Sequence, residues 1–360
     1  MLHFNLSEDQ QLIVDTVRKF AQDTLAKKAL EWDEGRELAA DSISGMAEMG
    51  LFGLTLSEEA GGAGLGMLAY AAAVEELARS CTSSARILVS QAGLCTAALE
   101  GVDAGAELLG ELAMGEKLAA YVGLDACVMA AAAGDGFTLD GNCPVATLAG
   151  KADVILVGTR TEDGGHALLQ VAADKVTTSD TGALGFRATA PAGLQFAGVS
   201  VPAGDVLATG DAAQAAIQRA EAAGGLGGAA RAGGAGYAAV QLAKSHAGER
   251  IAFGKPLLRQ QAVADKVVDT TRRLDGARHQ MVHAARMMDA GEDAHGATMQ
   301  AWLSATEAGI HAADEAIQIH GGYGYTTEYH VERHYRDICA LRTMDRGSEH
   351  LRRALAAAIA

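Results

Sequence analysis

The sequence predicts an α+β fold that is mainly helical, in which a small β domain separates two helical regions. Apolar residues recur at helical spacing from residue 3 to about residue 115, and again from about residue 212 to the end of the chain. Short β-rich segments, separated by Gly, Asp and Asn, fill the stretch between them. We therefore expect a helical domain over residues 1–117, a β-barrel-like domain over 118–208 and a helical bundle over 209–360.

Length, composition and net charge indicate the kind of fold and exclude one class of partner. The 360 residues are enough for a large core and more than one domain. Hydrophobic residues make up 49% and aromatic residues only 4%, with 44 Gly and 4 Pro, which favours alanine-rich helices. The formal net charge of -16 argues against nucleic acid as a partner.

The cysteines and the apolar segments indicate a compartment. No CxxC or metal-like spacing connects the five cysteines, which are Cys81, Cys95, Cys127, Cys143 and Cys339. We therefore expect reduced thiols and no metal site. No basic N-terminal region precedes an apolar core, and no apolar run is long enough to span a bilayer. These features predict a cytoplasmic protein without a membrane span.

Local signals predict the first helices. Ser7 and Gln10 form a capping-box pattern, and apolar residues follow at helical spacing as far as Leu25. Further helices fit residues 43–49 and 68–77, with the glycine-rich loop LFGLTLSEEAGGAGLG between them.

The middle of the chain contains the expected strands. They lie in the segments LAAYVG, GFTLDG, ADVILVGT, HALLQVA and LQFAGVSVP. We expect a hairpin within GFTLDGN, because the Asp140–Gly141 pair favours a tight turn. Beyond them, GGLGGAARAGGAGYAAVQLA predicts a buried bundle helix whose small residues let neighbouring backbones approach closely.

Near the end of the chain, a glycine pair divides two expected helices. Ile310, Ala313 and Ile317 fall on one helical face, and Gly321 and Gly322 then interrupt the pattern. A residue without Cβ enters positive φ without a clash, so the first helix should end at this pair. The second should begin at a hydroxyl residue of the following Thr-Thr dipeptide, Thr326 or Thr327.

The run DEAIQIHGGYGYTTEYHVERHYRD closely resembles the C-terminal signature of the acyl-CoA dehydrogenase family. That resemblance extends over nearly the whole chain and implies the family's fold, with helical, β and four-helix-bundle domains. It also implies FAD as cofactor and an acyl-CoA thioester as substrate. In the family, the residues matching Gln318, Gly321 and Gly322 hold the adenosine end of the FAD bound in the neighbouring subunit.

A second match lies in HAGERIAFGKPLLRQQ, which is similar to the family's RxxFGKPxxxxQ signature. By resemblance, Arg250 would bind the FAD pyrophosphate, Phe253 would be the aromatic residue beside it, and Gln261 would lie near the adenine. A guanidinium suits this role because its fixed fork donates to two phosphate oxygens and stays charged.

The segments that hold the subunit's own flavin in the family are altered. LDACVMAAAAGDGF stands where a Thr-Glu-Pro segment is usual. In GNCPVATLAGKADV, Cys143 replaces a Lys, Val145 replaces a Trp, and only Thr147 matches. An indole can cover one flavin face by stacking, whereas valine cannot.

The position of the family's catalytic base is altered too. Asp345 lies 23 residues after Gly322, the spacing at which the family has a Glu. The carboxylate is retained but is shorter by one methylene, and a general base must reach the proton that it abstracts. Arg346 replaces a usual Gly and would lower the proton affinity of Asp345. Gly225 stands where many members have an Arg near the acyl-CoA.

Residues that act across an interface are therefore kept, while those serving the chain's own flavin are changed together. This division predicts a half-site subunit of an FAD-dependent acyl-CoA dehydrogenase, which lends its contacts to the flavin of a paralogous chain in a heterotetramer. Two alternatives remain: a self-sufficient dehydrogenase, as a homotetramer with Asp345 as base, and a flavin-free acyl-CoA-binding or scaffold protein. The resemblance further implies electron-transfer flavoprotein or a similar acceptor as partner, and a role in lipid or steroid metabolism.

Overall fold

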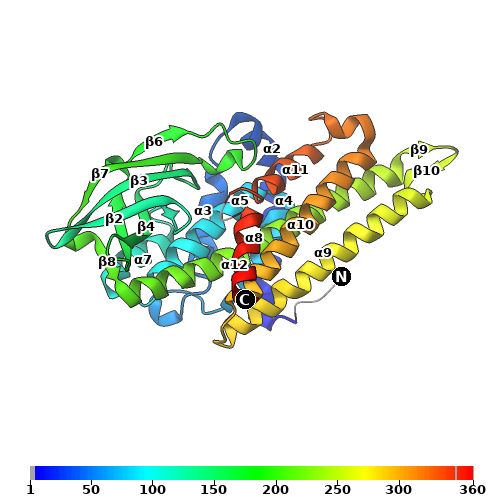
Figure 1. Cartoon of the computed structure of the whole chain (residues 1–360). Helices are drawn as coiled ribbons and strands as arrows, with labels where there is room; N and C mark the ends of the chain where they lie inside the picture. The colour runs from blue at the N-terminus through cyan, green and yellow to red at the C-terminus, as the bar shows by residue number, and fades with distance from the viewer. Residues whose placement is uncertain (1–4, 345–346, 360) are drawn as a thin grey trace.

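In the computed structural model, which describes residues 5–344 and 347–359, helices precede and follow a single large β-sheet. Figure 1 shows this sheet at one end of the molecule and a small hairpin, β9–β10, at the opposite end of the helical part. The predicted fold class, α+β and mainly α, is confirmed.

The N-terminal region is helical, as predicted. Ser7 and Gln10 form the expected capping box at the start of the first helix. The α-helices are α1 (Glu8–Phe20), α2 (Ala26–Gly35), α3 (Ala40–Glu48), α4 (Gly66–Ser80), α5 (Thr82–Leu88), α6 (Ala97–Leu99) and α7 (Ala106–Met114). Two π-helical stretches join them, η1 (Ala21–Leu25) and η4 (Val89–Thr96).

The sheet follows in the middle of the chain. Its strands lie in the order β6-β7-β3-β2-β4-β5-β8, and β1 pairs with β4 in parallel. The strands are β1 (Ala119–Val122), β2 (Cys127–Ala133), β3 (Gly136–Ala146), β4 (Val154–Thr161), β5 (His166–Ala172), β6 (Thr177–Asp180), β7 (Ala192–Val201) and β8 (Val206–Thr209). The strand segments identified in the sequence include β1, β3, β4, β5 and β7.

The predicted turn at Asp140–Gly141 is wrong. Both residues lie inside β3, and the two-residue turn between β2 and β3 is formed by Gly134 and Asp135 instead. Gly141 has φ 131° at a register shift between β3 and β7, and a Cβ there would lie 1.9 Å from the Cys127 carbonyl oxygen. This position therefore requires glycine because the pairing of β3 with β7 is irregular and the neighbouring strand β2 lies very close, and not because the residue forms a turn.

Helices resume after β8 and continue to the end of the described chain. They are α8 (Gly210–Glu249), α9 (Gln261–Asp289), α10 (His295–His320), α11 (Val331–Ala340) and α12 (Gly347–Ile359). The hairpin of β9 (Ile251–Ala252) and β10 (Lys255–Pro256) separates α8 from α9. The glycine- and alanine-rich segment is the middle of α8, which packs against α4, α9 and α10.

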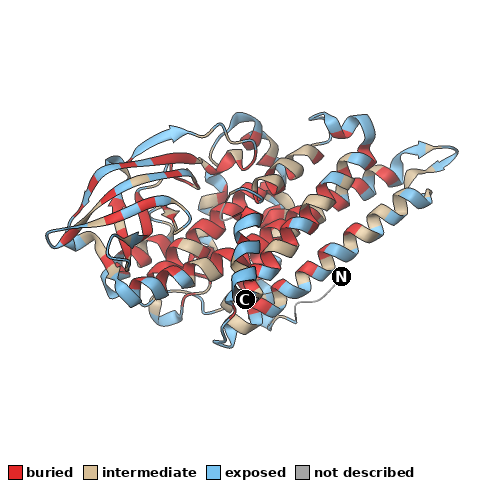
Figure 2. Cartoon of the chain, viewed as in Figure 1, coloured by how far each residue is buried: buried red, intermediate tan, exposed pale blue. Residues whose placement is uncertain are grey.

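Close backbone approach explains the glycines of α8. A Cβ on Gly234 would lie 2.4 Å from the Glu75 carbonyl oxygen of α4, so only glycine fits there without movement. Figure 2 shows that the buried residues are concentrated along these helices and on the inner face of the sheet. The prediction of a buried bundle helix is confirmed.

The glycine pair ends α10 as predicted, with Gly321 at φ 60° and ψ -134°. The next helix does not begin at Thr326 or Thr327, so that prediction is wrong. The Thr326 hydroxyl instead donates to the Tyr323 carbonyl at 2.9 Å, closing a turn. Residues 321–325 form a short 3₁₀ helix, and α11 begins five residues after Thr326, at Val331.

No helix in the described ranges is long and apolar enough to cross a membrane. Within those same ranges, no group of three or more His, Cys, Asp or Glu side chains could hold a metal ion. All five cysteines are free thiols.

Candidate functional site

An outer cavity of about 430 Å³ lies near the end of α8 and brings together three predicted cofactor residues, Arg250, Gly321 and Gly322. Arg250 directly follows α8; its N–H donates to the His246 carbonyl at 2.9 Å, and its carbonyl accepts from Leu257 N–H at 2.8 Å. A Cβ on either glycine would meet nothing within 4 Å. The glycines therefore leave open space beside a fixed arginine backbone.

The other three predicted residues do not line this cavity. Phe253 forms the tip of the β9–β10 hairpin with Gly254; both have positive φ, 52° and 77°, and the phenylalanine is 95% exposed. A left-handed phenylalanine is an unfavourable conformation that is typical of functional or contact positions. Gln261 begins α9 and Gln318 lies in the last turn of α10, and both are exposed.

Two histidines that the sequence analysis missed form one wall of the outer cavity. The rings of His246 and His320 stack with centroids 4.5 Å apart, and Tyr329 meets both edge-on at 5.4 and 5.5 Å. The His320 Nδ1–H donates to the Ala316 carbonyl at 2.7 Å. Burial, then His320 and Arg250, lower the pKa of His246, which favours its neutral form. This wall offers flat, mostly apolar rings.

An inner cavity of about 100 Å³ lies between β3, α8 and α10. Cys143 and Val145 of β3, Gly225 of α8 and Trp302 of α10 line it together. The structure therefore brings into one place the altered positions of the flavin cradle and of the acyl-CoA contact. Two acidic side chains, Asp125 and Glu221, and the guanidinium of Arg231 also line the cavity.

Large side chains occupy the space around the inner cavity because α8 presents glycines to them. A Cβ on Gly228 would lie 2.6 Å from the Trp302 indole, and one on Gly224 would lie 2.4 Å from a Leu94 methyl. The indole and the leucine therefore rest almost directly on the helix backbone.

A stack of buried cations adjoins the inner cavity. The guanidinium carbons of Arg86 and Arg231 lie 4.6 and 5.0 Å from the centroid of the Phe186 ring, and all three side chains are at most 2% exposed. Arg86 Nε donates to the hydroxyl of Thr147. Phe186 has φ 53°, and its N–H donates to Asp337 Oδ1 at 2.7 Å. The one visible sequence signal was an isolated Arg231 in a run of Gly and Ala.

Comparison with known proteins supports the resemblance. The model "Acyl-CoA dehydrogenase, N-terminal domain" matches residues 7–107, and "Acyl-CoA dehydrogenase, C-terminal domain" matches residues 214–360. Human mitochondrial short-chain specific acyl-CoA dehydrogenase is 31% identical, with 92% of this chain and 85% of that protein covered. The chain belongs to the acyl-CoA dehydrogenase family.

Other relatives match over most of their length. The short-chain specific acyl-CoA dehydrogenase of Clostridium acetobutylicum is 29% identical, over 93% of this chain and 94% of that protein. The structure of butyryl-CoA dehydrogenase from Megasphaera elsdenii is 27% identical and covers 99% of this chain and 100% of its own, with a TM-score of 0.91. Acyl-CoA dehydrogenases are oxidoreductases that act on CH–CH groups, and FAD is their cofactor.

The two cavities differ in how well their residues fit FAD. The outer one combines a guanidinium, an open glycine pair and flat rings, which suit a pyrophosphate and an adenosine. The inner one, at about 100 Å³, is below the roughly 300 Å³ at which small-molecule pockets begin, and far too small for a three-ring isoalloxazine. The described residues thus fit one half of the cofactor and not the other.

The predicted catalytic residue, Asp345, lies outside the described residues, as does Arg346. The described chain stops at Met344, whose Sδ accepts a hydrogen bond from Arg86 Nη1 at 3.7 Å. It resumes at Gly347, the first residue of α12. Met344, on one side of this pair, is thus hydrogen-bonded to the buried arginine stack, and Gly347, on the other side, begins a helix.

Proposed function

We propose that this chain is a half-site subunit of an FAD-dependent acyl-CoA dehydrogenase. It lends Arg250, Gln318, Gly321 and Gly322 to the flavin of a paralogous partner chain and holds no flavin of its own. When bound, FAD supplies the hydride acceptor for α,β-dehydrogenation of the acyl thioester. The expected electron acceptor of the assembled enzyme is electron-transfer flavoprotein or a similar protein.

The contrast between the two cavities carries this proposal. The outer cavity measures about 430 Å³ and the inner one about 100 Å³. In addition, five of the ten exposed large hydrophobic residues of the described chain lie in residues 251–253 and 323–329, which adjoin or line the outer cavity; they are Ile251, Phe253, Tyr323, Tyr325 and Tyr329. Exposed apolar side chains around a polar site are typical of a protein contact. A partner chain would cover them while it presents its flavin.

Flavin content tests the proposal. The chain purified alone is expected to contain little or no FAD, because the inner cavity lacks room for the isoalloxazine. Co-expression with a full-length paralogue should give about one FAD per pair of chains, since each unlike pair would contain one complete site. The visible spectrum and the released flavin, measured against protein concentration, give the ratio. A yellow homotetramer with one FAD per chain would refute the proposal, and a colourless complex would favour a flavin-free binding or scaffold role.

The self-sufficient enzyme remains the competing hypothesis, because Asp345 retains a carboxylate at the position of the family's base. Replacing Asp345 with Asn in the flavin-loaded complex separates the two. If the partner supplies the base, the turnover number should stay within about twofold, whereas loss of a true general base lowers rates by about 10²- to 10⁴-fold. Turnover per bound flavin is the measurement. A fall of about 100-fold in an intact complex would make this chain a dehydrogenase in its own right.

A further inference from the structure

A third cavity, of about 770 Å³, lies between the C-terminal end of α4, the second half of α8, the first half of α9 and the start of α11. No described residue lines both this cavity and either of the two cavities above. Its volume falls within the roughly 300–1,000 Å³ typical of small-molecule pockets. None of the predicted cofactor residues lines it.

The charged groups facing this cavity are mainly cationic. Arg79, Lys244, Arg278 and Arg333 line it, against the single carboxylate of Asp275. That carboxylate accepts a hydrogen bond from the Tyr237 hydroxyl at 2.5 Å. An excess of cations in one cavity is unusual for a chain with a formal net charge of -16.

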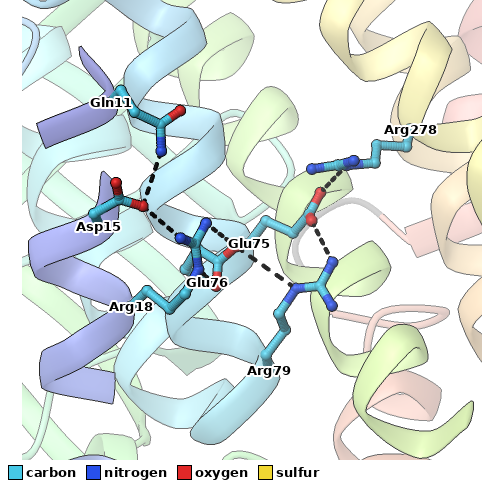
Figure 3. A network of polar contacts seen from close by, with 7 residues as sticks. All are labelled: Gln11, Asp15, Arg18, Glu75, Glu76, Arg79 and Arg278. Carbon is cyan, nitrogen blue, oxygen red and sulfur yellow. Dashed lines mark hydrogen bonds and ion pairs between the residues drawn. The ribbon is translucent and has the colours of Figure 1, made fainter. Parts of the chain in front are cut away.

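The two inner arginines, Arg79 and Arg278, are ion-paired with carboxylates that do not line the cavity, and Arg79 Nε also lies 4.0 Å from Glu76 Oε1. The buried carboxylate of Glu75 accepts from Arg79 Nη2 at 2.7 Å and from Arg278 Nε at 2.8 Å. Figure 3 shows both guanidinium groups directed at this one glutamate, which α4 supplies. Arg79 and Arg278 therefore form a fixed wall and are not the groups that need an anion.

The two outer cations have no such partner. Arg333 donates one long hydrogen bond, 3.4 Å, to the Ser80 carbonyl. Neither Arg333 nor Lys244 forms an ion pair with any residue of the ranges 5–344 and 347–359. The one carboxylate that lines the cavity, Asp275, is hydrogen-bonded to Tyr237. A guanidinium and an ammonium that face the same cavity and form no ion pair are matched by an anionic ligand.

The start of α11 adds uncharged donors to the same place. Its N-cap, His330, has φ 56° and makes no side-chain cap, so the first backbone N–H groups of the helix have no side-chain acceptor there. The one carboxylate of this first turn, Glu332, is ion-paired with Arg336 at 3.5 Å. A helix end of this kind favours a bound anion. One turn on, His334 lines the cavity at 3% exposure, and its buried Nδ1 has no hydrogen-bond partner.

His334 is held neutral. Burial, then Arg333 and Arg336, lower the pKa of His334 to about 3. A neutral imidazole carries a single N–H, which in one tautomer is on Nδ1 and can donate to a ligand oxygen. Because a buried polar atom without a partner is costly, a ligand that accepts this hydrogen bond would be stabilised.

We propose that this cavity binds a phosphate monoester, whose phosphate lies between Arg333, Lys244 and the N-terminus of α11. A phosphate group suits these three donors because its several oxygens can bind the Arg333 guanidinium, the Lys244 ammonium and the backbone N–H groups of α11 at the same time. A cavity of about 770 Å³ is much larger than a phosphate group, so the esterified part lies along the wall formed by Tyr237 and Gln241.

Calorimetric titration of the assembled protein at low ionic strength tests this site. Ribose 5-phosphate and inorganic phosphate should both bind, and ribose should not, because the anion is the recognised group. Removing a charge-assisted contact costs about 1.5–3 kcal/mol, so Arg333→Ala should raise the dissociation constant about 10- to 100-fold. Lys244→Ala, which changes an exposed side chain and leaves folding intact, should weaken binding in the same direction.

Two controls separate this cavity from other cationic sites. Arg259→Ala removes an arginine of the short 3₁₀ helix before α9 that lines none of the three cavities, and it should leave ribose 5-phosphate binding unchanged. Arg272→Ala removes an exposed arginine of α9 that is ion-paired with Asp269 at 2.6 Å, and it too should have no effect. The proposal is overturned if neither phosphate compound binds, if ribose binds equally well, or if Arg333→Ala and Lys244→Ala bind like the parent.

Discussion

Replacing Arg250 with Ala is expected to weaken FAD retention in the assembled complex by about 10- to 100-fold. The guanidinium is the cation of the outer cavity and follows α8, where hydrogen bonds of its backbone to His246 and Leu257 hold it in place. A charge-assisted hydrogen bond to a phosphate is among the stronger polar contacts in proteins. Its loss should therefore appear directly in the flavin dissociation constant.

Equilibrium dialysis of the complex, with released flavin measured by fluorescence, provides this constant. Arg259→Ala serves as a matched control, because Arg259 lies nearby in the short 3₁₀ helix before α9 but does not line the outer cavity. Loss of FAD without loss of assembly would support a direct contact. If the Arg250→Ala complex keeps its flavin as well as the parent does, Arg250 is only a surface charge and the half-site assignment fails.

The largest effect on stability is expected for Glu75→Gln, which should lower the free energy of unfolding by about 3–5 kcal/mol. Glu75 is 1% exposed and accepts from Arg79 and Arg278, which come from α4 and α9 (Figure 3). The amide keeps the shape but removes the charge, so Arg79 and Arg278 lose the buried carboxylate that they share, and Arg79 keeps only the more distant Glu76, at 4.0 Å. Breaking a buried ion pair in this way costs far more than the pair contributes on its own.

Urea denaturation followed by circular dichroism measures this loss, and the adjacent glutamate supplies the control. Glu76 is less buried, with a side chain 12% exposed, and its partner Arg18 is 40% exposed. Solvent reaches the Arg18 guanidinium, which also keeps Asp15 as a second carboxylate, so Glu76→Gln should cost less than Glu75→Gln, on the order of 1 kcal/mol. If both variants lost the same free energy of unfolding, the burial of Glu75 would not be the reason for its contribution to stability.

Much of the fold could be predicted from local sequence patterns. The capping box at Ser7, the buried Gly- and Ala-rich helix and the end of α10 at Gly321 all depend on residues within a few positions of one another. The errors arose where distant strands or turns competed with a local signal. Asp140–Gly141 reads as a turn, yet Gly134–Asp135 makes the turn, and Gly141 instead accommodates the neighbouring strand.

In the candidate site, too, the residues within local motifs could be predicted, whereas those brought together from distant segments could not. The residues predicted to contact the flavin could be named from the sequence because Arg250, Phe253 and Gln261 lie within one short motif, as do Gln318, Gly321 and Gly322. The stacked His246 and His320 could not be named, because the two rings come from the ends of different helices. The phosphate cavity was equally hidden, since it depends on Lys244 and Arg333 being brought together without counter-ions.

By itself, the sequence determined the family, the order of helices and strands, and which of the family's signature residues are kept or altered. Only the tertiary structure decided how much room the altered positions leave. The inner cavity is small because Trp302 and Leu94 rest on glycines of α8, and because Arg86, Phe186 and Arg231 pack together from segments up to 145 residues apart. Cavity size is set by close packing of side chains that are distant in the chain, and no local pattern encodes it.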